Sequence, residues 1–126
     1  MGNDEVRVLI TDDNRSARRG LIALLARIPE IEVLCEAANG QEAIDLMALH
    51  QPDVVLMDAQ MPEMDGLEAT RRIKGTWPTV KIIVLTIHPQ YRQRALAAGA
   101  DAFLLKGDTA ESLWHTILKT KEKGKT

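Results

Sequence analysis

The chain is poor in several features that would mark particular classes of protein. It contains a single cysteine, Cys35, which excludes an internal disulfide and a metal site built from several cysteines. We interpret Cys35 as a small core residue of a protein that occupies a reducing cytoplasm. No apolar run is long enough to span a membrane, and the first residues lack the pattern of a signal peptide. The sequence therefore predicts a cytoplasmic protein without a membrane partner.

The chain also lacks a large excess of positive or negative charge. The 16 basic and 18 acidic residues give a net charge of -2, so nothing in the composition predicts that the domain itself binds nucleic acid. Aromatic residues make up 3% of the chain, yet the hydrophobic content of 45% is enough for a core. The 126 residues suit one domain, expected at residues 6–119. Residues 1–5 are expected to be an N-terminal extension, and residues 120–126 a basic tail or the start of a linker.

What the chain does contain is a regular alternation of apolar runs with segments of helical spacing. Strands are expected at residues 6–11, 31–37, 53–57, 80–85 and 100–105. Helices are expected at about residues 15–28, 40–50, 67–74, 89–99 and 109–119. This alternation predicts an α/β fold in which right-handed crossovers place helices on both faces of a parallel sheet.

Polar residues stand where several of these helices should begin. Asn14 is a candidate N-cap, and Asn39 with Glu42 forms an asparagine version of a capping box. Asp108 or Thr109 is expected to cap the last helix. The partial alternation of residues 31–37 places that strand near an edge of the sheet.

The stretch from Val54 to Gly66 is the strongest functional signal in the chain. Four apolar residues end on Asp58, and a loop that contains Pro62 and Asp65 follows before the next helix. In open α/β sheets, ligands bind just beyond the carboxyl ends of the strands. A carboxylate at that position must be solvated, paired or bound to a cation, since burying it alone is costly.

Other strands also end on polar residues, and parallel strands bring these ends to one edge of the sheet. The expected cluster holds three carboxylates, a hydroxyl and an ammonium: Asp12, Asp13, Asp58, Thr86 and Lys106. Crowded carboxylates take up a proton or a cation, and oxygen ligands of this kind favour Mg2+. A carboxylate beside Mg2+, with a lysine and a hydroxyl nearby, has the parts needed to accept a phosphoryl group.

On these residues the chain resembles the receiver domain of bacterial two-component response regulators. The resemblance covers about residues 5–120 and includes Met61-Pro62 and Asp65-Gly66, in the order found in the family. Residues 85–88, 95–100 and 103–106 resemble the NarL/LuxR group. The resemblance implies a flavodoxin-like (βα)5 fold, which is a doubly wound parallel sheet of five strands in the order 2-1-3-4-5.

The resemblance also implies a role for each residue of the cluster. Asp58 would be the phosphoacceptor, charged by a sensor histidine kinase or a small phosphodonor. Asp12, Asp13, Asp58 and the backbone carbonyl of Gln60 would hold Mg2+ (or Mn2+). Thr86 and Lys106 would bind the phosphoryl group, Thr86 and Phe103 would form the conformational switch, and Gln60 and His88 would tune dephosphorylation. The domain would be a signalling receiver, not an enzyme acting on a diffusible substrate.

Two features depart from the usual family pattern. Gly107 follows Lys106 where many members have proline, and Phe103 lacks the hydroxyl of the more common tyrosine. Members of the NarL/LuxR group usually carry a C-terminal helix-turn-helix domain that binds DNA, and this sequence does not include one. The implied output is transcription through such a domain, with homodimerisation on phosphorylation. The alternative is a free-standing receiver that acts on a protein partner.

Two functions of other classes are weighed against the receiver. A Mg2+-dependent phosphohydrolase could form an aspartyl phosphate, but Asp58-Ala59-Gln60 lacks the second acid of haloacid-dehalogenase-like enzymes. An interaction module that works without phosphorylation would not need the complete set of acids with its lysine and hydroxyl.

Several other residues have plain structural interpretations. Asp65 is expected to be a turn residue, Arg18 and Arg19 to be solvated, and Trp77 and Trp114 to pack or form an interface.

Overall fold

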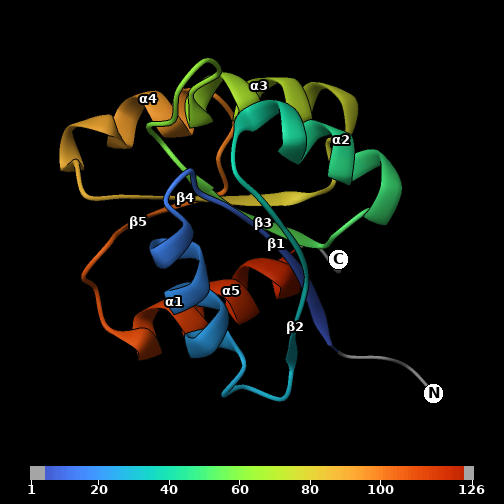
Figure 1. Ribbon diagram of the computed structural model, residues 1–126, viewed down its shortest axis with the longest axis vertical. Helices are drawn as coiled ribbons and strands as arrows, with labels where there is room; N and C mark the ends of the chain where they lie inside the picture. Colours follow the sequence, from blue (N-terminus) through green and yellow to red (C-terminus); the bar gives the residue numbers. More distant parts are fainter. Residues whose placement is uncertain (1–4, 124–126) are drawn as a thin grey trace.

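Within residues 5–123, which the computed structural model describes, five strands form one parallel sheet (Figure 1). The strands are β1 (Val6–Thr11), β2 (Ile31–Ala37), β3 (Val54–Asp58), β4 (Lys81–Thr86) and β5 (Ala102–Leu105). Their spatial order is β2-β1-β3-β4-β5, and every neighbouring pair is parallel. The predicted fold and strand order are confirmed, and the partly alternating strand lies at an edge.

Helices cover both faces of the sheet. They are α1 (Arg15–Leu25), α2 (Gly40–His50), α3 (Gly66–Thr76), α4 (Arg92–Ala97) and α5 (Ala110–Lys123), with a 3-10 turn, η1 (Pro89–Tyr91), before α4. In Figure 1, α2, α3 and α4 lie above the sheet, and α1 and α5 lie below it. No helix in the described part of the chain is both long enough and apolar enough to cross a membrane.

The core has two layers, one on each face of the sheet. Along β3, Val55 and Met57 pack with α2 and α3, whereas Val54 and Leu56 pack with α1 and α5. This alternation follows the two-residue repeat of a strand. Because β3 is covered on both faces, its sequence is apolar at every position until it ends on Asp58.

The two tryptophans belong to different layers. Trp77 directly follows α3 and packs against the layer that contains α2, α3 and α4. Trp114 on α5 packs in the opposite layer, where its indole N–H donates a hydrogen bond of 3.1 Å to the carbonyl of Leu24. The Arg27 guanidinium lies 5.5 Å from the centre of the Trp114 ring. Both side chains are packing residues within this domain.

The predicted caps are present. The Asn14 side chain accepts from the N–H of Ala17, and the Asn39 side chain accepts from the N–H of Glu42. The Glu42 carboxylate accepts from Ala38, one residue before the cap, so this capping box is shifted by one residue. For the last helix, the sequence left Asp108 and Thr109 as alternative caps, and the structure shows that Thr109 is the cap. The Thr109 hydroxyl caps α5, while the Asp108 carboxylate accepts from the N–H of Leu105.

Several element boundaries differ from the prediction. The first helix ends at Leu25 and not near Ile28, because a residue before proline, here Pro29, is disfavoured in the helical conformation. The third helix continues through Gly75 to Thr76. A single exposed glycine costs a helix only about 1 kcal/mol, whereas the Trp77-Pro78 sequence ends it.

The predicted domain boundaries at residues 6 and 119 can be compared with the structure only in part. Helix α5 continues to Lys123, so part of the segment expected to be a tail or linker is helical. The remainder of that segment, residues 124–126, lies outside the described residues, as do residues 1–4 of the expected N-terminal extension. The last strand begins at Ala102, two residues later than expected.

The start of α3 lies directly against the end of β3. The N–H of Gly66 donates to the carbonyl of Ala59 at 2.9 Å. A Cβ atom at Gly66 would lie 1.8 Å from the carbonyl oxygen of Asp58, far inside the contact distance. Glycine at this position therefore allows the backbone of the loop to close beside the end of the central strand.

Candidate functional site

The residues predicted to cluster do lie together, in a cleft at the carboxyl edge of the sheet. The cleft has a volume of about 230 Å³. Its lining residues lie at or just after the ends of β1, β3, β4 and β5: Asp12, Asp13, Asn14, Asp58, Gln60, Thr86, Ile87, His88 and Lys106. Every predicted site residue except Phe103 belongs to this set.

Three carboxylates share one side of the cleft. One oxygen atom from each of Asp12, Asp13 and Asp58 lies within 4.8 Å of the others. The Asp12 and Asp58 side chains are buried, whereas Asp13 is exposed. Asp12 is held from both sides, because its N–H donates to the carbonyl of Ala37 and its carboxylate accepts from the N–H of Asn14.

Lys106 provides the positive charge opposite these acids. Its ammonium nitrogen lies 2.7 Å from Oδ2 of Asp12 and 3.5 Å from Oδ2 of Asp58. Burial alone would lower the pKa of Lys106, but the hydrogen bond to Asp12 and the charges of Asp58 and Asp12 raise it above its ordinary value. The lysine is therefore a cation at neutral pH.

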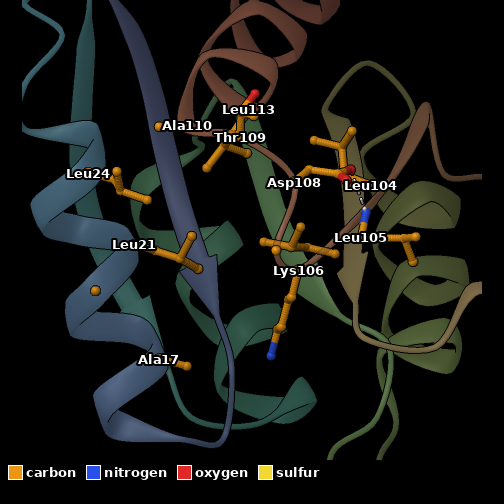
Figure 2. Close-up of a pocket in the computed structure, with 13 residues that line it drawn as sticks. Ala17, Leu21, Leu24, Leu104, Leu105, Lys106, Asp108, Thr109, Ala110 and Leu113 are labelled. Carbon is orange, nitrogen blue, oxygen red and sulfur yellow. Dashed lines mark hydrogen bonds between the residues drawn. The ribbon is translucent and has the colours of Figure 1, made fainter.

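The lysine side chain leads from an apolar groove to the acidic cleft. The groove has a volume of about 280 Å³ and lies between α1 and the segment that joins β5 to α5. Figure 2 shows Leu21 and Leu24 on the α1 side of this groove. In the same view the Lys106 side chain extends to the level of Ala17, near the beginning of α1. Aliphatic contacts thus surround the base of Lys106 while its charged end reaches the carboxylates.

The Asp58 carboxyl group has a raised pKa of about 6. Burial is the largest cause, because it disfavours the charged form. The positive charge of Lys106 opposes this effect, and the negative charge of Asp12 adds to it. The N–H of Gln60, which donates to Oδ1 of Asp58 at 3.3 Å, also lowers the pKa. Asp58 is consequently ionised at neutral pH, but at a cost in stability.

The remaining predicted residues are placed around this centre. Thr86 is buried at the end of β4, and its hydroxyl accepts from the N–H of His88 at 3.2 Å. Phe103 pairs with Val84 on the neighbouring strand and packs, half-buried, against the layer of α2, α3 and α4. The Arg92 guanidinium lies 5.9 Å from the centre of the Phe103 ring. Phe103 therefore lies beside the cleft and not in its lining.

Two loop residues near the cleft have structural roles. The Asp65 side chain accepts from the N–H of Glu68 and caps α3, and it is not one of the three clustered acids. Gly107 has a φ of 101°, in a region that favours glycine.

Cys35 is partly buried against the core, and this burial raises the pKa of its thiol.

The prediction that Arg18 is solvated is wrong. Only 14% of its side chain is exposed, whereas 60% of the Arg19 side chain is exposed, as expected. Arg18 donates from Nη1 to the carbonyl of Asp12 at 2.7 Å and from Nε to the carboxylate of Glu36 at 2.8 Å. It thereby ties the turn after β1 to the end of β2. Glu36 pairs with Ile10 on β1, a register that the sequence does not show.

Tyr91 is a second residue that the sequence analysis did not connect with the site. Its hydroxyl accepts a hydrogen bond of 2.7 Å from the side-chain amide of Gln60. The two residues are 31 positions apart, so no local pattern announces their contact.

Comparisons with known proteins agree with this geometry. Residues 8–118 match the family described as the response regulator receiver domain. The transcriptional regulatory protein DegU of Brevibacillus brevis is 36% identical over 93% of this chain and 50% of its own length. The response regulator protein VraR of Staphylococcus aureus is 39% identical over 91% of this chain and 56% of its own length.

A solved structure is similar over most of its length. The LuxR-family two-component response regulator from Aurantimonas sp. SI85-9A1 has a TM-score of 0.90 and 30% identity, over 94% of this chain and 86% of that one. By contrast, the chain spans about half the length of the curated relatives it matches. Together with the family match, these similarities show that the chain belongs to the response regulator receiver domain family and, within it, to the NarL/LuxR group.

Proposed function

We propose that this receiver domain accepts a phosphoryl group on Asp58 from a sensor histidine kinase and changes conformation in response. One observation carries the proposal. The buried Asp58 carboxylate shares a cleft with two further acids, the Lys106 ammonium and the Thr86 hydroxyl. These are the groups that phosphoryl transfer to a carboxylate needs, and they come from four different strand ends.

In the proposed reaction an oxygen of the Asp58 carboxylate attacks phosphorus and forms a new O–P bond. The bond from phosphorus to the leaving group breaks, and the leaving group is a histidine nitrogen of the kinase or the acetate of acetyl phosphate. Lys106 binds one phosphoryl oxygen through its ammonium, and Thr86 donates its hydroxyl to another. Asp58 itself is the nucleophile, so it must be ionised when the donor arrives.

The donor set of the cleft fits a hard divalent cation, Mg2+ or Mn2+. Three carboxylate oxygens lie within 4.8 Å of one another, and oxygen-only ligands of this kind match Mg2+. Asp12, Asp13 and Asp58 would hold the ion, with the backbone carbonyl of Gln60 as a further ligand. When bound, the cation supplies neutralising charge for the transferring phosphoryl group.

The proposed response begins at Thr86. Its hydroxyl now accepts a hydrogen bond from the N–H of His88, two residues further along the chain. Contact with a phosphoryl group would draw Thr86 inward, and Phe103 would then repack into the space that it leaves. Such a change would remodel the face formed by α4, β5 and α5. Gln60 and His88, which line the cleft, are placed to influence how long the phosphoryl group persists.

The names and lengths of the relatives suggest which process this conformational change controls. DegU is named as a transcriptional regulatory protein, and the relatives are about twice as long as the matched region. We infer that the domain controls transcription through a DNA-binding domain outside these 126 residues, with homodimerisation on phosphorylation. A free-standing receiver that acts on a protein partner is the alternative. Equal sedimentation with and without phosphorylation would argue against dimerisation of this domain.

The site assignment is tested by intact mass after incubation with acetyl phosphate and Mg2+. We expect one phosphoryl adduct on the wild type, dependent on Mg2+ and absent from Asp58→Asn. The matched control is Asp65→Asn, which alters a nearby acid outside the cluster and should still be phosphorylated. An adduct that persists in Asp58→Asn would contradict the assignment. Rapid production of phosphate from an added phosphomonoester would instead favour a phosphohydrolase.

The charge of Lys106 predicts a stability change that Mg2+ reverses. Lys106→Met should lower the free energy of unfolding by about 2 kcal/mol, since two buried carboxylates lose the cation that they share. Saturating Mg2+ should restore most of this loss, because the ion neutralises the same acids. Urea unfolding at neutral pH, with Mg2+ or with EDTA, measures both quantities.

The control for this experiment is Lys74→Met. Lys74 forms an ion pair with Asp101 at 3.1 Å and donates to two backbone carbonyls, away from the cleft. Its loss should destabilise the domain equally in Mg2+ and in EDTA. If Mg2+ rescued both variants alike, or neither of them, the cation would not be acting at the acids beside Lys106.

A further inference from the structure

A hydrogen bond joins two loops at one wall of the cleft. Gln60 lies in the loop after β3, and Tyr91 ends the 3-10 turn η1 after β4. Nε2 of Gln60 donates to the hydroxyl oxygen of Tyr91 at 2.7 Å. Tyr91 is the single tyrosine of the chain. The bond therefore couples a cleft-lining residue to one that does not line the cleft.

Tyr91 has several contacts besides its hydrogen bond to Gln60. Its ring meets the His88 ring edge to face, with 5.8 Å between the ring centres. The Arg94 guanidinium lies 5.1 Å from the centre of the tyrosine ring, and Tyr91 also packs against the core. These contacts support the ring, so its hydroxyl offers an acceptor to which an exposed side chain can be tethered.

Gln60 is the exposed partner, and it is close to Asp58. Its own N–H donates to Oδ1 of Asp58 at 3.3 Å, while its side chain is exposed. A glutamine side chain that starts beside the carboxylate is long enough to fold over it. The hydrogen bond to Tyr91 instead joins the carboxamide to a residue outside the cleft lining.

We propose that Tyr91 is a positioning residue that holds the Gln60 carboxamide at the rim and so keeps Asp58 open to small phosphodonors and water. This inference rests on the proposed function of Asp58. Two reactions need that access. Asp58 attacks the phosphorus of acetyl phosphate and expels acetate, and water later attacks the phosphorus of the aspartyl phosphate, releasing inorganic phosphate and the Asp58 carboxylate. A released carboxamide competes for the space that both reactions require.

The test is a double-mutant cycle of Tyr91→Phe, Gln60→Ala and the two together. Tyr91→Phe keeps the ring and its contacts with His88 and Arg94 but removes the hydroxyl. We expect it to slow both phosphorylation by acetyl phosphate and loss of the phosphoryl group by about two- to fivefold, the bias that one exposed neutral hydrogen bond provides. In the Gln60→Ala background the same change should alter neither rate, since no carboxamide remains to be held.

Two further readouts separate positioning from a general structural effect. The Tm and the Mg2+ affinity of Tyr91→Phe should equal those of the wild type, because a structural role of the hydroxyl would move the Tm. Side-chain amide NMR signals of Gln60 should shift in Tyr91→Phe, which tests the tether directly. Unchanged rates in Tyr91→Phe, faster rates, or an equal slowing in the Gln60→Ala background would each overturn this inference alone. Absence of any phosphoryl adduct on the wild type would overturn the proposed function and this inference with it.

Discussion

Gly66→Ala should lower the free energy of unfolding by at least about 3 kcal/mol, or prevent folding altogether. The new Cβ would lie 1.8 Å from the carbonyl oxygen of Asp58 and 3.0 Å from the Cα of Ala59. Both neighbours are backbone atoms at the buried end of β3, so they cannot move aside as the end of a flexible side chain would. Relief requires the start of α3 to move away from the central strand.

The matched control lies in the same helix. Gly75→Ala has open space around the new Cβ, and the residue is inside α3. This substitution should stabilise the domain by about 0.5–1 kcal/mol, the usual advantage of alanine over glycine within a helix. Chemical denaturation of the two variants measures both changes. If Gly66→Ala were as stable as the wild type, the close approach of α3 to Asp58 would be wrong.

Asp58→Asn should stabilise the domain at pH 7 in EDTA by up to about 3 kcal/mol, because it removes a buried charge while keeping the shape of the side chain. The pKa of Asp58 is about 6 in the folded protein, compared with an ordinary value of 3.8. Because the pKa of Asp58 is higher in the folded protein than in the unfolded chain, the protonated carboxyl stabilises the fold. This stabilisation is complete at a pH below the pKa of the unfolded chain. The stabilisation is lost as the pH rises through the pKa of Asp58 in the folded protein. The wild type therefore loses stability between about pH 4 and pH 6 relative to the variant.

Urea unfolding of both proteins from pH 4 to pH 8 measures this difference. The two curves should lie closest at pH 4, where the Asp58 carboxyl of the folded protein is still neutral, separate as the pH rises to about 6, and run parallel above that pH. Saturating Mg2+ should narrow the gap at pH 7 by stabilising the wild type, since binding to the folded state alone adds to its stability. A constant difference at every pH would show that the effect comes from packing and not from ionisation.

Much of the site could be predicted from the sequence because it depends on regular structure. Asp12, Asp58, Thr86 and Lys106 each stand at or just after the end of an apolar strand, and parallel strands must place those ends on one edge. The fold, the strand order and the clustering of the three acids follow from this regularity. The N-caps were equally accessible, since a cap depends on residues only a few positions apart.

The contacts that sequence reasoning missed depend on side-chain direction between elements that are distant in the chain. The sequence predicts that Arg18 and Arg19 are both exposed. Only the placement of Glu36 and of the Asp12 carbonyl decides that Arg18 is the one that turns inward. The Gln60–Tyr91 bond is of the same kind, since it joins two irregular loops. Helix ends near Pro29 and Gly75 were misplaced because propensity is weak compared with packing and proline geometry.

The division of the two tryptophans between opposite layers gives the protein a built-in pair of optical probes. Trp77 senses the layer with α2, α3 and α4, and Trp114 senses the layer with α1 and α5. Neither residue lines the acidic cleft, so replacing one by phenylalanine leaves the other as a reporter of a single layer. Fluorescence of the two single-tryptophan proteins can then time separately how events at Asp58 reach each face of the sheet.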